Sequence, residues 1–220
     1  QTLDALLALV RPEDTLLDVG TGTGRFAVPL AHVVRHVTAL DHAPAMLAVL
    51  ERKLVAERLS NVTIVETAWE AAEVPPHDVV LAAWSLYRQL DLRSTVEKLV
   101  AATRRTLVII APDMADPPHR PLVQSIWDRD GEPDVPTYLY ILGALRQLGV
   151  RADLRVVHET RLVVGRCPTE LAHQLAPIDG TEADIQRLAS GLLPLLQQYG
   201  DDWQYAYTFP AAIMTWRPAG

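Results

Sequence analysis

The fold of this chain is decided by the stretch Asp18-Val19-Gly20-Thr21-Gly22-Thr23-Gly24. Residues 15–19 form a short apolar run, which is typical of a buried strand, and residues 24–34 place apolar side chains at helical spacing. Alternate glycines let the backbone turn sharply and approach a ligand closely, because a Cβ atom there would occupy the ligand's space. The first amide groups of the helix suit a carboxylate or a phosphate. The stretch therefore predicts a binding loop between a strand and a helix.

Strands and helices alternate along the first half of the chain. Parallel strands need crossover connections, which the predicted helices provide. We therefore expect an α/β fold, Rossmann-like and doubly wound, with a mostly parallel seven-stranded sheet. The further elements predicted here are an amphipathic helix at residues 1–10, strands at 36–40, 61–65, 78–83 and 107–111, and helices at 43–59 and 92–102.

The second half of the chain is less regular. Residues 112–136 are dense in proline, which disfavours continuous regular structure, and we interpret them as a lid or substrate segment. We expect a helical insertion over residues 168–200, and a C-terminal antiparallel strand pair that completes the sheet of a single domain, residues 1–220. The predicted elements are a helix at 137–148, strands at 154–164, 203–209 and 211–216, the last two separated by Pro210, and helices at 169–176 and 182–198.

A carboxylate closes the second predicted strand, at Ala39-Leu40-Asp41. It follows the glycines by roughly twenty residues, and an acid at that place can accept hydrogen bonds from both hydroxyl groups of a ribose. Strand, glycine loop, helix, strand and terminal acid thus follow one another in the order of a nucleoside site.

In this order of elements the chain resembles the class I S-adenosylmethionine-dependent methyltransferases, whose first motif has an acid, one intervening residue and three alternate glycines. The resemblance is strongest over residues 16–111, and it implies S-adenosylmethionine as the cofactor and methyl transfer as the activity. It also implies that Asp18 orients the loop or accepts from the cofactor's amino group, and that Asp41 holds the ribose. The residues implied to cradle the methionine part are Gly20, Thr21, Gly22 and Gly24, and those implied to flank the adenine are His42 and Met46.

The chain departs from this family after the third strand. The family usually places an acid there against the adenine amino group, whereas this sequence has Glu66-Thr67-Ala68-Trp69-Glu70. Ala68 and Trp69 are expected to contact the adenine instead. After the fourth strand, Trp84 is expected near the sulfonium, because the face of an aromatic ring favours a cation.

The sequence indicates less clearly which residues bind the methyl acceptor. Tyr87, Trp127 and Tyr138 are predicted to line an apolar pocket for a modest organic substrate. Candidate proton acceptors are His119, Asp113 and Tyr138, but no catalytic residue is assigned, since methyl transfer depends mainly on alignment and a base is optional. No Asn-Pro-Pro-Tyr-type segment follows the fourth strand, which within the resembling family disfavours exocyclic-amine or glutamine acceptors.

The amino-acid composition limits the classes of partner that we expect for this chain. The formal net charge is −7 and no window gathers lysine and arginine on one face, so a nucleic-acid partner is not expected. No apolar run reaches the ~18 residues of a membrane span. The single cysteine excludes an internal disulfide, and the seven histidines show no metal-ligand spacing. We expect a cytoplasmic enzyme with a small-molecule acceptor, no membrane partner and no metal.

Three other functions remain open at this point. Gly22-Thr23-Gly24-Arg25-Phe26-Ala27 also satisfies a loosened dinucleotide fingerprint, so an NAD(P)-dependent oxidoreductase is the first alternative. The second is a methyltransferase for RNA or protein, which the acidic charge disfavours. The third is a non-catalytic cofactor-binding module, because the acid after the third strand is missing.

Overall fold

The protein is described by a computed structural model that covers residues 1–86, 91–113, 117–127, 136–177 and 180–218. The chain packs into two compact units. The first unit comprises Gln1–Asp113, Pro136–Val157 and Ala211–Gly220, and the second comprises Met114–Val135 and His158–Pro210. The two segments singled out in the sequence, residues 112–136 and 168–200, fall almost wholly in the second unit. That the whole chain is one domain stays a prediction.

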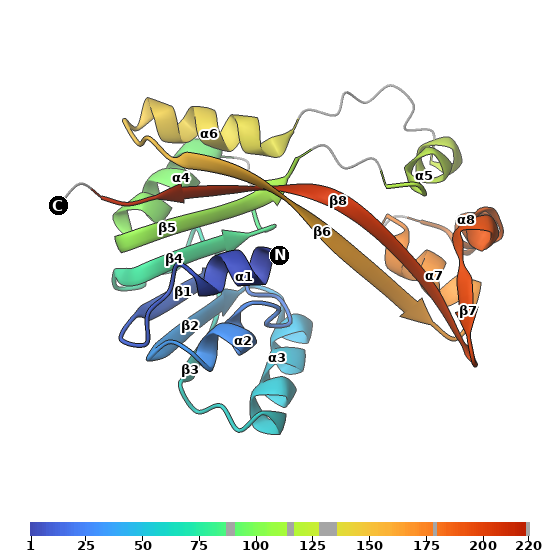
Figure 1. Ribbon diagram of the computed structural model, residues 1–220, viewed down its shortest axis with the longest axis horizontal. Coiled ribbons are helices and arrows are strands. Elements are labelled where there is room, and N and C mark those ends of the chain that lie inside the picture. The colour runs from blue at the N-terminus through green and yellow to red at the C-terminus, as the bar shows by residue number, and fades with distance from the viewer. Residues whose placement is uncertain (87–90, 114–116, 128–135, 178–179, 219–220) are drawn as a thin grey trace. The chain divides into compact units, whose positions relative to one another are not determined.

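The first unit is built on a mostly parallel sheet (Figure 1). Its strand order is β3-β2-β1-β4-β5-β8-β6, in which β3 to β5 pair in parallel and β8 is antiparallel to β5. This order confirms the predicted doubly wound fold with antiparallel C-terminal strands. The strands are β1 (Thr15–Val19), β2 (His36–Asp41), β3 (Val62–Glu66), β4 (His77–Ala83), β5 (Thr103–Pro112), β6 (Asp153–Gly165) and β8 (Asp202–Trp216). Of the last two, residues 153–157 and 211–216 belong to the first unit.

Helices cover both faces of this sheet (Figure 1). Leu6, Leu30 and Leu50 bring the first three helices into one buried cluster with the sheet, and Leu99 and Ile141 bring two others into a second cluster on the opposite face. Successive side chains of a strand point to opposite faces, so both faces need an apolar cover. The helices are α1 (Thr2–Leu7), α2 (Ala27–Ala31) and α3 (Pro44–Ala56) on one face, and α4 (Leu92–Ala101) and α6 (Thr137–Gln147) on the other.

The second unit contains α5 (Arg120–Ile126), α7 (Pro168–Leu175), α8 (Glu182–Leu192), a short 3-10 helix (Leu193–Leu195) and β7 (Gln197–Tyr199). Its largest buried cluster joins α7 and α8 through Ala172, Leu188 and Leu192, with Leu122 of α5 packed against it. The strand β7 pairs in antiparallel fashion with the beginning of β8. This unit thus has an apolar core of its own.

Three predicted elements differ from the structure. The proline-dense segment contains the helix α5, because Pro121 lies in its first turn, where proline loses no helical hydrogen bond. The helix predicted at residues 182–198 ends at Leu192, because Pro194 disfavours its continuation. Pro210 does not interrupt β8, because it lies between the residues that pair with β7 and those that pair with β5.

The helix after the glycine loop is also shorter than predicted, Ala27–Ala31 instead of residues 24–34, because the loop with its left-handed glycines extends through Gly24. Within the described part of the chain, every helix is too short or too polar to cross a lipid bilayer.

Candidate functional site

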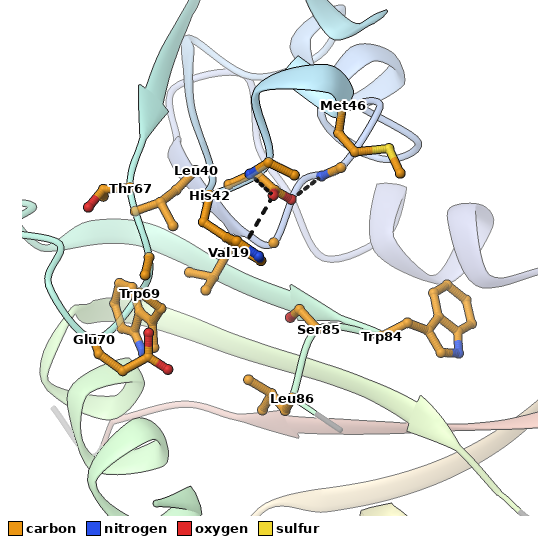
Figure 2. Close-up of a pocket in the computed structure, with 15 residues that line it drawn as sticks. Val19, Leu40, His42, Met46, Thr67, Trp69, Glu70, Trp84, Ser85 and Leu86 are labelled. Carbon is orange, nitrogen blue, oxygen red and sulfur yellow. Dashed lines mark hydrogen bonds and ion pairs between the residues drawn. The ribbon is translucent and has the colours of Figure 1, made fainter. Parts of the chain in front are cut away.

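A cavity of about 550 Å³ opens at the carboxyl ends of β1, β2 and β4 (Figure 2). The strand order reverses at β1, which lies between β2 and β4, and ligands of open α/β sheets bind at such a switch point. All lining residues belong to the first unit. The sequence-predicted residues among them are Gly20, Gly22, Asp41, His42, Met46, Ala68, Trp69 and Trp84.

The three loop glycines have different roles. All have positive φ, at 76° for Gly20, 55° for Gly22 and 78° for Gly24. A Cβ atom on Gly22 would meet nothing within 4 Å, so this position borders open pocket space. A Cβ on Gly20 would lie 2.3 Å from the Cβ of Ser85, and one on Gly24 would lie 2.4 Å from Leu50 Cδ1. Packing within the protein therefore also requires a glycine at these two positions, of which Gly20 lines the cavity as well.

Beneath the loop lies a buried carboxyl group. Asp18 is only 2% exposed, and its Oδ2 accepts a hydrogen bond of 2.8 Å from the Thr21 hydroxyl. Neither residue lines the cavity, and their hydrogen bond joins the end of β1 to the glycine loop. Burial raises the pKa of Asp18 to about 6, the Thr21 hydrogen bond lowers it, and the negative charge of Asp41 raises it further.

The raised pKa of Asp18 predicts a stability that depends on pH. The folded state binds this proton more tightly than the unfolded chain, whose pKa is near the ordinary 3.8. The contribution of Asp18 is therefore most favourable below about pH 4 and is lost, by roughly 3 kcal/mol, as the pH rises through about 6. In urea unfolding, Asp18→Asn is expected to gain stability relative to wild type between about pH 4 and pH 7. A difference that stays constant over this range would contradict the assignment.

The carboxylate of Asp41 joins the glycine loop to the start of α3. Its Oδ2 accepts a hydrogen bond of 2.8 Å from the Gly22 amide, and its Oδ1 accepts one of 2.9 Å from the Ala43 amide. The imidazole Nδ1 of His42 lies 3.7 Å from Oδ1. A carboxylate offers about four acceptor positions. Asp41, which also lines the cavity, therefore keeps acceptor capacity for a ligand.

The side of the cavity after β3 is built around Trp69. This indole is 4% exposed, its Nε1 donates a hydrogen bond of 3.3 Å to the backbone oxygen of Thr95, and the Lys98 ammonium lies 4.6 Å from the ring centre. The indole therefore has a fixed orientation. Ala68 beside it lines the cavity through a small side chain at the place where an acid was expected from the resemblance, and Glu70 lines the same wall.

Trp84 lines the opposite side of the cavity and has an unusual backbone, with φ at 50°. Its ring stacks on Phe26 at a centroid distance of 5.7 Å, and the Arg25 guanidinium carbon lies 4.5 Å from the ring centre. Figure 2 shows the side chain extending away from Trp69 and Ser85. The Arg25 guanidinium thus already lies over this ring, and a sulfonium near Trp84 stays a prediction.

The predicted acceptor residues stay predictions, and the structure describes two of the three. Tyr138 packs against the second buried cluster of the first unit, and Trp127 packs in the second unit. Tyr87 lies outside the described residues. His119 is buried in the second unit with its Nδ1 3.0 Å from the Tyr205 hydroxyl oxygen, and burial lowers its pKa to about 4.

Other lining residues were not among the predicted sites. One feature of the sequence could have identified them. Each lies next to a predicted site residue near the end of a parallel strand, where side chains of neighbouring strands converge. They are Val19, Leu40, Ala43, Thr67, Glu70, Ser85 and Leu86. The described residues contain no cluster of three His, Cys, Asp or Glu side chains placed to hold a metal ion.

Known sequences similar to this chain include methyltransferases. Residues 16–107 match a family described as a methyltransferase domain. An uncharacterized protein of Haemophilus influenzae is 32% identical over 152 residues, which are 67% of this chain and 55% of that protein. A probable ribosomal RNA small subunit methyltransferase A of Methanosphaera stadtmanae is 25% identical over 73 residues, 33% of this chain and 27% of that protein. The chain spans about half of the first relative and about a quarter of the second.

Solved structures share the fold. A proposed methyltransferase from Bacillus halodurans superposes with a TM-score of 0.67 at 16% identity, covering 98% of this chain and 97% of that one. A SAM-dependent methyltransferase from Aquifex aeolicus has a TM-score of 0.54 at 21% identity, covering 70% of this chain and 82% of that one. These likenesses show the Rossmann-like architecture.

Proposed function

We propose that this chain is a class I S-adenosylmethionine-dependent methyltransferase that transfers the methyl group of S-adenosylmethionine to a small-molecule acceptor. The match of residues 16–107 to a family described as a methyltransferase domain supports the family. The observation that carries the proposal is the pairing of Gly22 with Asp41. The Gly22 amide, which has open space in front of it, donates a hydrogen bond of 2.8 Å to the Asp41 carboxylate, and this carboxylate also lines the cavity. This pairing suits a ribose beside a close backbone approach.

The residues of the cavity fit the parts of the cofactor. Asp41 would accept from the ribose hydroxyls, and Gly20 and Gly22 would border the methionine part. Met46 and the wall formed by Ala68 and Trp69 would enclose the adenine, since their surfaces are largely apolar. A cavity of about 550 Å³ has the size typical of cofactor sites.

Bound S-adenosylmethionine supplies an electrophilic methyl group. The contribution of this chain is to hold the cofactor at the strand ends and to leave one side open for an aligned acceptor. Alignment of two reactants at ~3 to 3.5 Å can by itself account for a large part of the acceleration. The buried carboxyl of Asp18 acts indirectly, by holding the Thr21 hydroxyl and with it the loop.

The small-molecule acceptor is supported by the charge of the chain. A net charge of −7 opposes approach to the phosphate backbone of RNA, whose neutralisation dominates most protein–RNA affinity. An RNA acceptor is the second candidate, favoured by the match over 73 residues to a probable ribosomal RNA methyltransferase.

Calorimetry with separate cofactors tests the cofactor part of this proposal. We expect saturable binding of S-adenosylhomocysteine and none of NAD or NADP under the same conditions. Binding of NAD in the absence of S-adenosylhomocysteine binding would instead support the oxidoreductase.

The acceptor is tested by incubating the protein with tritiated S-adenosylmethionine and a cell extract separated into small molecules, RNA and protein. Label is expected in the small-molecule fraction. Label in RNA or protein would overturn the proposed acceptor class, and cofactor binding without any label transfer would support the non-catalytic module.

A further inference from the structure

A second cavity of about 440 Å³ lies in the first unit, beside α1 and the strands β6 and β8. None of its lining residues lines the cofactor cavity. We call it the arginine pocket. Its lining residues are Ala5, Ala8, Leu9, Arg151, Asp153, Arg155, Ile213, Thr215, Trp216 and Arg217.

Strand periodicity places the charged residues on the side of the sheet that faces α1. Val157 of β6 and Ile213 of β8 are buried in the same cluster as Leu6 of α1. Residues two apart on a strand share a face. Arg155 therefore lies on the face of Val157, and Thr215 on the face of Ile213. The polar part of the pocket thus borders the apolar surface of α1.

The three arginines of the pocket are exposed, and the described part of the chain supplies no carboxylate bonded to any of them. By contrast, Arg105 on the neighbouring strand β5 forms an ion pair with Asp14. With three arginines and one aspartate in its lining, the pocket has a formal charge of +2 in a chain whose net charge is −7. Clustered like charges repel one another, so this arrangement favours binding of an anion.

An alternative role for charged residues on β6 is to keep this edge strand from pairing with another chain, and one charged residue is enough for that. That role does not require Arg151, Arg155 and Arg217 to border one cavity, because Arg217 follows a different strand. The convergence of the three side chains on one cavity therefore needs another reason.

We propose that the arginine pocket binds a small phosphate monoester whose organic part rests on Ala5, Ala8 and Leu9 of α1. Planar guanidinium groups match the oxygens of a phosphate in pairs. A phosphate monoester carries a charge of about −1.5 to −2 near neutral pH, which balances the charge of the pocket. The apolar floor distinguishes such an ester from free inorganic phosphate. This inference does not depend on the proposed methyl transfer.

The proposal is tested by titrating phenyl phosphate and inorganic phosphate into the full chain, with S-adenosylhomocysteine present so that the cofactor cavity cannot take up the probe. We expect saturable binding of both probes, with phenyl phosphate several-fold tighter because of the apolar floor. Arg155→Gln and Arg217→Gln are each expected to weaken phenyl phosphate about tenfold. The matched control is Arg93→Gln, which removes the same charge from exposed Arg93 of α4 on the other face of the sheet and should leave the affinity unchanged.

NMR chemical shifts of the backbone amides, measured on the isotope-labelled wild-type protein, test the proposal without any variant. Phenyl phosphate is expected to shift the amides of Ala8 and Thr215 but not that of Gly22. Three results would overturn the proposal: titrations that do not saturate, affinities unchanged in both pocket variants, or shifts confined to the cofactor cavity. An RNA oligonucleotide that binds far more tightly than phenyl phosphate, with the same sensitivity to Arg155→Gln, would also overturn it in favour of an RNA-binding surface.

Discussion

Asp41→Asn is expected to weaken the binding of S-adenosylhomocysteine by about a hundredfold or more. The Asp41 carboxylate accepts from the Gly22 amide at 2.8 Å and from the Ala43 amide at 2.9 Å. An asparagine side chain has one oxygen and one NH2 group, so one of these amides would face another donor. The loop and the start of α3 would then lose their common anchor, together with the acceptor proposed for the ribose. Calorimetry on the folded variant measures the change.

The matched control for this prediction is Glu66→Gln. Glu66 is the register partner of Asp41 on β3, is exposed, and does not line the cavity. The control removes the same charge from the neighbouring strand end and should leave the affinity unchanged. Asp41→Asn has a second expected effect, since the Asp41 charge raises the pKa of Asp18 and its removal should lower that pKa. Unchanged affinity in Asp41→Asn would show that the carboxylate is not part of the cofactor site.

Gly24→Ala is expected to destabilise the folded protein by roughly 2 to 4 kcal/mol. The new Cβ would lie 2.4 Å from Leu50 Cδ1 and 3.0 Å from Val28 Cγ2, and φ at this position is 78°. Leu50 is fully buried and cannot move away without disturbing its neighbours. Unfolding in urea measures this loss, and a variant as stable as wild type would contradict the packing role of Gly24.

Gly22→Ala is the matched comparison for the same loop. Its Cβ would meet nothing within 4 Å, so the cost in stability is limited to the left-handed backbone, about 1 to 2 kcal/mol. The methyl group would instead project toward the cavity. We expect this variant to lose affinity for S-adenosylhomocysteine about tenfold or more while remaining the more stable of the two. If Gly22→Ala binds as wild type does, the close approach of a ligand at this position is refuted.

The order of the elements was predictable because it depends on local signals. Apolar runs and helical spacing in the first half identified the strands and helices of the sheet, and the crossover rule then determined that neighbouring strands are parallel. Two of the failed predictions come from a proline that was read without its position. Pro121 begins a helix and Pro210 continues a strand, because what matters is whether a backbone amide is needed there.

The candidate site was only partly predictable. The glycine motif and Asp41 identified two walls of the cavity, since both are signals within a short stretch of chain. The stacking of Trp84 on Phe26 and Arg25, and the packing of Trp69 against α4, join residues far apart in the sequence or depend on side-chain direction. No periodicity in the sequence contains that information.

By itself, the sequence predicted the strand, the glycine turn and the strand-end carboxylate that meet at one cavity, because backbone conformation and strand periodicity are local properties. Only the tertiary structure decided at which glycine an added Cβ would have free space, since that depends on what lies opposite each Cβ position: Ser85 for Gly20, Leu50 for Gly24 and nothing within 4 Å for Gly22. It also brought Arg151 and Arg155 beside Arg217, because the strands β6 and β8, distant in sequence, are neighbours in the sheet.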